Sequence, residues 1–286
     1  MTMTGSAVVT SRLQRVFSTL RAQNKAGLVV YIMASDPNID TSLALLRDLP
    51  KVGVDIIELG VPFSDPLADG PVLQTASHRA LKAGGSLVRT LEMARLFRTK
   101  NDTTPLILMG YYNPIYVYGP EKFAKAAATV GIDGCIIVDL PPEEANEVVK
   151  FLKPRGIDFI FLTTPTTDCS RLPVILENSS GFLYYVSILG ITGTLSATRQ
   201  TIDRAVTQLR DKTEMPVAVG FGIKTPEQVA TVASVADAVV IGSAVVQRIA
   251  EGLDTKGQLQ PGVIANVLSF IEELAIAAHT SHTRVV

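Results

Sequence analysis

The stretch VDIIELGVPFSDPLADGP, from Val54 to Pro71, joins an apolar strand pattern to an acidic, proline-rich loop. Its first half predicts a strand in which Val54, Ile56 and Glu58 share one face, because successive side chains of a strand point to opposite sides. If that face is part of a core, an ionised Glu58 carboxylate is costly unless it is paired or protonated. The pattern therefore predicts that the Glu58 carboxyl group, at the end of a buried strand, has a compensating interaction or a function.

Apolar runs of strand length recur along the whole chain, and segments with helical periodicity lie between them. The expected strands span residues 27–33, 54–60, 105–110, 134–139, 158–163, 181–187, 216–221 and 237–243. This alternation is typical of a parallel sheet. In 286 residues it favours a single α/β domain, a closed (β/α)8 TIM barrel, with a doubly wound open sheet as the alternative.

The ends of the chain extend this expectation. Residues 11–23 predict an extra N-terminal helix that caps the bottom of the barrel. We expect the catalytic barrel to span residues 11–275, between a flexible N-terminus (1–10) and a flexible tail (276–286).

Composition points to a small-molecule substrate. Lys and Arg (26) nearly balance Asp and Glu (27), so neither nucleic acid nor membrane is an expected partner. Two cysteines are too few for a disulfide framework, and Cys135 is expected to be a small buried hydrophobe. This favours a cytoplasmic location, although the Ser, Thr and Arg content of the N-terminus leaves an organelle transit peptide open.

Polar residues follow several expected strands, at the end of a barrel where active sites lie. They are Glu58, Tyr111, Asp139, Tyr184 and Thr192. A single acid at such a position is as often a paired structural carboxylate as a catalytic one. The convergence of several acids and tyrosines favours catalysis.

Glycine-rich loops after the last three strands predict a phosphate site. Exposed backbone N–H groups and the dipole of a following helix can hold a dianion without any lysine. The expected cradle is Gly193, Gly220, Gly222, Gly242 and Ser243. Each glycine could instead serve only the backbone angles of a turn.

The histidines do not form a metal site by their spacing. His78, His279 and His282 are scattered, and the last two are expected to be solvated in the polar tail. No metal is therefore expected.

Together, ELGVPFSDPLADGPVLQ, YIMASDP, YYNPI, VDLPPEE, YYVSILGITGT, GFGIKTPEQV and VIGSAVV closely resemble the motifs of the tryptophan synthase alpha subunit family, from about Leu13 to Glu273. The resemblance implies a TIM barrel that cleaves indole-3-glycerol phosphate to indole and D-glyceraldehyde 3-phosphate without a cofactor. It also implies that indole passes to a beta subunit in an alpha2beta2 complex. That partner would dock around Pro62, Asp65 and the YYNPI loop.

The resemblance assigns roles to individual residues. Glu58 matches the general acid/base, and Asp69 matches the acid that accepts the indole N–H. Tyr184 matches a substrate contact, and Phe221 with Ile241 would line the pocket. Further substrate contacts are expected from Tyr31, Leu73, Tyr111, Asp139 and Thr192. Residues 62–71 would form a mobile loop that closes over the substrate.

The chain departs from the family pattern at a few positions: Met33, Ser35, Thr164 and Ile188. None of them is one of the two acids, so the expected chemistry is unaffected. Two other functions stay open on the sequence alone. One is a free-standing lyase that releases indole, and the other is a phosphate-binding barrel without turnover.

Overall fold

The computed structural model describes residues 11–168, 170–187, 199–220 and 222–281. The strands are β1 (Gly27–Met33), β2 (Ile56–Gly60), β3 (Leu106–Gly110), β4 (Gly134–Ile137), β5 (Asp158–Phe159), β6 (Leu162–Thr163), β7 (Leu183–Val186), β8 (Val217–Gly220) and β9 (Ala238–Ile241). The α-helices are α1 (Arg12–Ala22), α2 (Ile39–Asp48), α3 (Pro71–Lys82), α4 (Leu87–Arg98), α5 (Tyr112–Tyr118), α6 (Pro120–Thr129), α7 (Asn146–Leu152), α8 (Leu172–Asn178), α9 (Arg199–Arg210), α10 (Pro226–Ala233), α11 (Ser243–Glu251) and α12 (Val263–Thr280). Short 3-10 helices are η1 (Leu49–Val52), η2 (Pro142–Glu144) and η3 (Lys153–Arg155).

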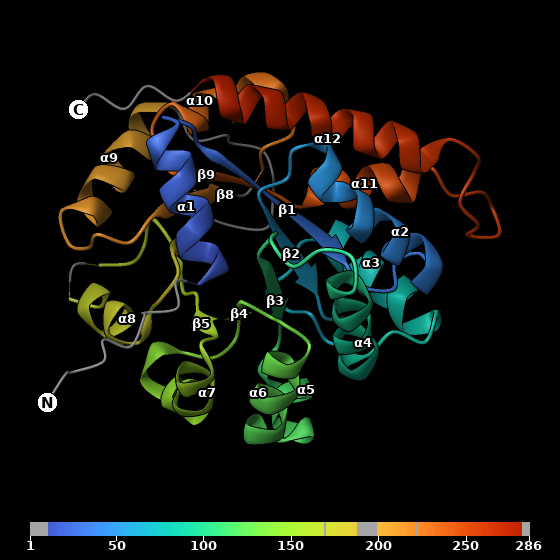
Figure 1. Ribbon diagram of the computed structural model, residues 1–286, viewed down its shortest axis with the longest axis horizontal. Helices are drawn as coiled ribbons and strands as arrows, with labels where there is room; N and C mark the ends of the chain where they lie inside the picture. Colours follow the sequence, from blue (N-terminus) through green and yellow to red (C-terminus); the bar gives the residue numbers. More distant parts are fainter. Residues whose placement is uncertain (1–10, 169, 188–198, 221, 282–286) are drawn as a thin grey trace, which may run out of the picture.

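All strand pairs are parallel, and the nine strands follow the order β5-β4-β3-β2-β1-β9-β8-β7-β6. Helices surround the strands (Figure 1). The two edge strands are consecutive pieces of the expected strand 158–163. The Ile160 N–H donates to the Cys135 carbonyl of β4, and the Phe161 carbonyl accepts from the Tyr184 N–H of β7. The chain itself thus joins both edges of the sheet, and the predicted barrel is confirmed.

The inside of the barrel is filled by one face of each strand. Val29, Ile56, Ile107, Ile136 and Val240 are among its buried side chains. Val54, expected on this face, precedes β2 and packs in the outer layer instead. Strand alternation therefore applies only from Ile56 onward.

The expected capping helix is α1. A capping box between Ser11 and Gln14 starts this helix. Its Leu13 and Phe17 belong to the inner core, where the Phe17 ring lies 5.7 Å from that of Phe182. The helix therefore closes the end of the barrel opposite the carboxyl ends of the strands, as predicted.

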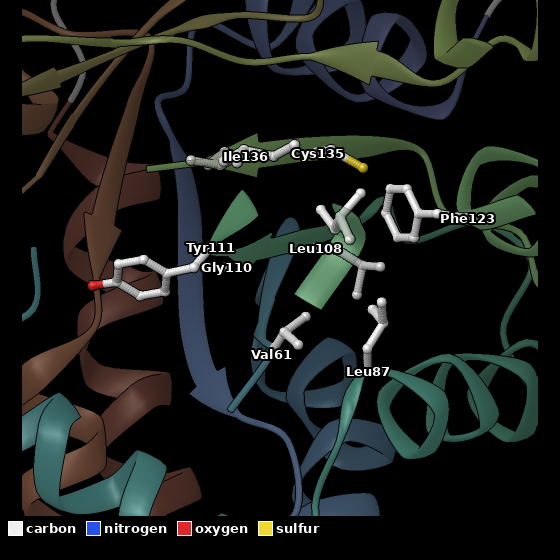
Figure 2. A pocket seen from close by; sticks show the side chains of 10 residues that line it. Val61, Leu87, Leu108, Gly110, Tyr111, Phe123, Cys135 and Ile136 are labelled. Atoms are coloured by element: carbon white, nitrogen blue, oxygen red, sulfur yellow. The ribbon is translucent and has the colours of Figure 1, made fainter. Parts of the chain in front are cut away.

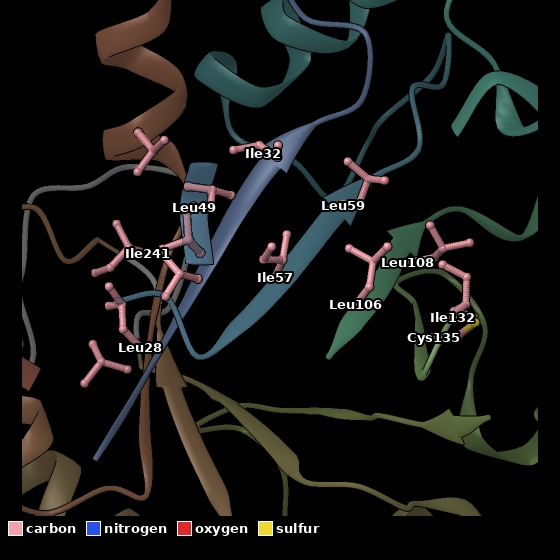
Figure 3. Close-up of a cluster of buried hydrophobic side chains, with 14 of the residues drawn as sticks. Leu28, Ile32, Leu49, Ile57, Leu59, Leu106, Leu108, Ile132, Cys135 and Ile241 are labelled. Atoms are coloured by element: carbon pink, nitrogen blue, oxygen red, sulfur yellow. The ribbon is translucent and has the colours of Figure 1, made fainter. Parts of the chain in front are cut away.

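The second face of the strands packs against the helices. Figure 3 shows Leu28, Ile57, Leu59 and Leu108 among the side chains of this outer layer. Cys135 lies in the same layer as a free, buried thiol, which confirms its predicted role, and burial raises the pKa of the thiol. Both layers are packed with buried side chains, so a ligand site has to form at the strand ends and in the loops.

The end of the chain differs from the expectation. α12 continues to Thr280, so the predicted tail from residue 276 is wrong over its first five residues. Ala278 is buried, and His279 Nε2 lies 2.8 Å from Asp55 Oδ2, so His279 is not simply solvated. By length and hydropathy α12 could span a membrane, but Ile271 and Leu274 on its apolar face are buried against the rest of the protein.

Asp133 fastens the bottom of the barrel. Its buried carboxylate accepts hydrogen bonds from Arg98 Nη2 at 2.6 Å, Arg12 Nη1 at 3.0 Å and the Leu106 N–H at 2.8 Å. One acid thus joins α1, α4 and β3. Burial lowers the pKa of Arg98 to about 10, and the nearby Asp133 charge opposes this shift. Without Asp133, the buried Arg98 guanidinium would keep its hydrogen bonds to the Gly131 and Thr104 carbonyls but would lose its paired negative charge.

We therefore expect Asp133→Ala to lower the free energy of unfolding by about 3 kcal/mol, as is usual when one partner of a buried ion pair is removed. Urea unfolding measures this loss. The control is Asp48→Ala, because Asp48 pairs with exposed Lys51 and should contribute less than about 1 kcal/mol. Equal losses of unfolding free energy in the two variants would contradict the stabilising role of Asp133 between α1, α4 and β3.

Candidate active site

A cavity of about 350 Å³ opens where the carboxyl ends of the strands meet. It is lined by strand residues, by the loop that leads into α3, and by the loops after β8 and β9. The lining side chains and backbone segments are Tyr31, Glu58, Ala68, Asp69, Gly70, Pro71, Val72, Leu73, Met109, Val138, Leu162, Thr164, Tyr184, Val186, Gly222, Ile223, Lys224, Val240, Gly242 and Ser243. Two acids thus share one largely apolar cavity, as expected for Glu58 and Asp69.

Glu58 lies at the floor of this cavity. In the barrel it is flanked by Tyr31 of β1 and Ile107 of β3, and it follows the inward-facing Ile56. It is 1% exposed, and its Oε1 has no hydrogen-bond partner in the part of the chain that the structure describes. Burial raises the pKa of its carboxyl group to about 8, so it carries a proton at neutral pH.

Two tyrosines border Glu58, and glycines make room for both. A Cβ added at Gly60 would lie 2.1 Å from Tyr31 Oη, and one at Gly220 would lie 2.7 Å from Tyr184 Oη. Burial raises the pKa of both phenols, and nearby negative charge adds to the rise, chiefly from Asp69 at Tyr31 and from an ionised Glu58 at Tyr184. Both hydroxyls therefore remain protonated and can only lose a proton at high pH.

Asp69 reaches the cavity from the loop between β2 and α3. This loop contains no helix or strand, as predicted, yet hydrogen bonds hold it at several points. The Phe63 N–H donates to Ser77 Oγ at 2.8 Å, the Ala68 N–H donates to Tyr111 Oη at 2.9 Å, and Gln74 Nε2 donates to the Asp69 carbonyl at 2.9 Å. These bonds connect the loop to Ser77 and Gln74 of α3 and to Tyr111.

The two acids differ in their proton affinity. Burial raises the pKa of Asp69 to about 6, and a hydrogen bond from Tyr111 limits the rise. Glu58, whose Oε1 has no hydrogen-bond partner among the described residues, holds its proton more tightly because burial raises its pKa further. At neutral pH the cavity therefore contains one protonated carboxyl group and one mostly ionised carboxylate.

The expected phosphate residues gather at another part of the same cavity. Gly222, with φ of +78°, turns the chain after β8, while Gly242 and Ser243 form the start of α11. Gly220 lies against Tyr184, so its contact with a phosphate remains a prediction. Gly193, Thr192 and Phe221 lie outside the described residues.

Some of the other predicted substrate contacts line the cavity, and others do not. Tyr31, Leu73 and Tyr184 line the cavity. Exposed Asp139 accepts a hydrogen bond from the Tyr112 N–H at 2.7 Å, so it fixes the start of α5 instead. The expectation for Ile241 is wrong, because alternation along β9 turns Val240 into the cavity and Ile241 into the outer layer.

Tyr111 contacts the loop that carries Asp69 and does not line the main cavity in the described residues. Its backbone borders an apolar void of about 10 Å³ that also touches Leu108 and Cys135 and is too small for a substrate. Figure 2 shows the Tyr111 ring pointing away from these side chains. Its hydroxyl group instead meets Ala68 and Asp69.

Sequence reasoning missed several cavity residues. Met109, Val138, Leu162, Val186 and Val240 could have been found by taking the last inward-facing position of each strand. Lys224 had no such signal, because a lysine after a glycine turn usually lies on the surface. It is nevertheless the one basic residue among the described residues that line the cavity.

Comparison with known proteins agrees with this site. The sequence model of the family described as tryptophan synthase alpha chain matches residues 17–275. The crystal structure of tryptophan synthase subunit alpha from Legionella pneumophila is 37% identical and has a TM-score of 0.85, with 94% of this chain and 98% of that chain covered. A structure from Aquifex aeolicus is 36% identical (TM-score 0.84, coverage 94% and 99%), and one of tryptophan synthase from M. tuberculosis is 32% identical (TM-score 0.82, coverage 94% and 100%).

Because Glu58 is buried in its protonated form, the stability of the fold should depend on pH. Because the folded-state pKa of about 8 exceeds the ordinary value of 4.5, Glu58 destabilises the fold increasingly as pH rises from one value to the other. Glu58→Gln removes this dependence. The Tm of the variant minus the Tm of the unchanged protein should therefore increase up to about pH 8 and then level off. Thermal unfolding across this pH range measures the difference. A constant advantage, like that of a surface control such as Glu177→Gln, would contradict the buried proton.

Proposed function

Because the chain belongs to the tryptophan synthase alpha chain family, it is a lyase that cleaves indole-3-glycerol phosphate, and we propose that Glu58 and Asp69 carry out this cleavage. The reaction gives indole and D-glyceraldehyde 3-phosphate and serves tryptophan biosynthesis. The observation that carries the proposed roles is the pairing of a buried, protonated carboxyl group with a second acid in one cavity.

Glu58 acts as both acid and base. Its proton goes to indole C3, which leaves a positive charge on the ring nitrogen. The resulting carboxylate then takes the proton from the hydroxyl group on the carbon attached to C3. As the aldehyde C=O forms, the C3–carbon bond breaks and its electrons return to the ring. Glu58 ends with a proton, so the two transfers balance on one group.

Asp69 stabilises the intermediate charge. With a pKa of about 6 it is mostly ionised at neutral pH, and it accepts the indole N–H. Its attraction grows when the ring nitrogen becomes positive, so it favours the intermediate over the substrate. The Tyr111 hydroxyl group donates a hydrogen bond to the Asp69 carboxylate and holds it in place.

The substrate phosphate binds at the other part of the cavity. In this proposal the N–H groups of Gly222, Gly242 and Ser243, which line the cavity, bind the phosphate together with the predicted Gly193 and Gly220, and the positive end of the α11 dipole favours a dianion. The indole ring lies between this end and Asp69, along Leu73 and Tyr184. Binding at both ends orients the C3 carbon above Glu58.

Glu58→Gln keeps the shape of the side chain but removes the transferable proton. We expect the cleavage rate to fall by at least about a hundredfold while glycerol 3-phosphate still binds. Steady-state assays for indole release and calorimetry for binding measure the two effects. Retention of more than about a tenth of the rate would overturn the assignment, provided Glu177→Gln is fully active. Asp69→Asn should also be slow, because an amide cannot balance the indole cation.

The family works with a beta subunit. We extend the proposal to an alpha2beta2 complex in which that subunit docks on the strand-end face around Pro62, Asp65 and residues 111–115. Large apolar side chains on this face support the choice: Leu67 is 86% exposed, and Tyr116 and Val117 of α5 are 64% and 78% exposed. Exposed apolar groups of this size are typical of interfaces. The Ala68–Tyr111 hydrogen bond ties the two segments together.

Addition of the cognate beta subunit should therefore raise the cleavage rate by about tenfold or more, because the partner completes closure of the site. Val117→Asp should weaken this response, whereas Val88→Asp, an equally apolar exposed position on α4, should not. Titration of the alpha subunit rate with beta subunit measures both. A fast isolated chain that does not respond would favour the free-standing lyase.

A cytoplasmic location is also part of the proposal. It is supported by the free, buried Cys135 thiol and by a partnership that keeps indole between two enzymes of one compartment.

A further inference from the structure

The cavity gathers more negative charge than its helix ends can balance. A phosphate monoester carries close to two negative charges at neutral pH, and the same cavity contains the mostly ionised Asp69, whereas protonated Glu58 adds no charge. The N-terminus of a helix offers only about half a positive charge. Like charges in a confined site weaken binding of the ligand, so the dianion needs a further counter-ion.

Lys224 is the only described cation that lines this cavity. It follows Gly222 and Ile223 on the loop that also forms the expected phosphate cradle. Its backbone N–H donates to Gln228 Oε1 at 2.7 Å, and Gln228 also takes part in the capping box that starts α10. The base of the lysine is therefore fixed by a helix terminus.

The side chain of Lys224 is uncommitted by contrast. No ion pair or hydrogen bond joins its ammonium group to another residue within the described segments. A lysine stem is long enough to move its charge by several ångströms, and the exposed Lys224 can do so without breaking a contact. A merely solvated lysine would share this freedom, but Lys224 lines the same cavity as Gly242 and Ser243.

We propose that the Lys224 ammonium group is the counter-ion of the substrate phosphate and selects phosphorylated over unphosphorylated substrates. This inference rests on the proposed phosphate site and adds to it a charged residue that a site of backbone N–H groups lacks. The charge lies on the same loop as Gly222, which belongs to the proposed phosphate site. Lys224 therefore affects binding of the glycerol phosphate half and leaves the proton transfers of Glu58 unchanged.

The reverse condensation of indole with D-glyceraldehyde 3-phosphate separates the two halves of the substrate. In Lys224→Gln we expect the KM for glyceraldehyde 3-phosphate to rise about five- to tenfold, because a charge-assisted contact is lost at a partly exposed site. The KM for indole and kcat should change by less than about twofold. Lys224→Arg should restore most of the affinity. The rise should shrink at high salt, where the contact is screened.

Two variants calibrate this result. Lys125→Gln makes the same charge change at an exposed site on α6 and should leave every constant unchanged. Ser243→Glu places a like charge in the proposed cradle and should raise the same KM more strongly.

An unchanged KM in Lys224→Gln together with a raised KM in Ser243→Glu would overturn the role of Lys224 and leave the phosphate site in place. Unchanged values in both variants would overturn the phosphate site as well. Equal rises in the KM for indole and for glyceraldehyde 3-phosphate would show a disturbed loop and would also contradict the counter-ion role.

Discussion

The structure depends on a single costly placement, a carboxyl group at the floor of an apolar barrel with one oxygen that has no hydrogen-bond partner among the described residues. Glu58 is there because β2 alternates, and the parallel register with β1 and β3 surrounds it with Tyr31 and Ile107. Gly60 then lets the Tyr31 ring pass close over the strand. Burial keeps the proton on Glu58 at neutral pH, so the same packing that costs stability supplies the acid that the reaction needs.

Around this group the barrel separates stability from chemistry. The bottom of the barrel is closed by α1 and stabilised by the ion pairs of Asp133 with Arg12 and Arg98. The cavity is at the other end, where the carboxyl ends of the strands lie. At the strand ends, irregular loops are held by single side chains, Ser77 and Tyr111 among them. A loop held in this way can carry Asp69 at a defined position and still adjust when substrate or a partner binds.

Much of this could be predicted from the sequence because strand alternation is a local rule. It predicted the direction of Glu58, while the succession of strand-like and helical segments predicted the barrel and its capping helix. Strand alternation was applied wrongly to Val54, which precedes β2, and was not applied to Ile241. Asp69 needed the family resemblance, since a loop has no periodicity. The division of one strand into β5 and β6, the His279–Asp55 contact and the position of Lys224 arise from tertiary packing, which local patterns do not encode.

The central claim, that burial keeps Glu58 protonated in the working pH range, can be measured without turnover. Infrared difference spectra between the unchanged protein and Glu58→Gln isolate the C=O stretch of this one protonated carboxyl group. The account predicts a band that is present at neutral pH and disappears with a midpoint near the pKa of about 8. A band that is already lost by about pH 5, near the ordinary pKa of a glutamate, would contradict it.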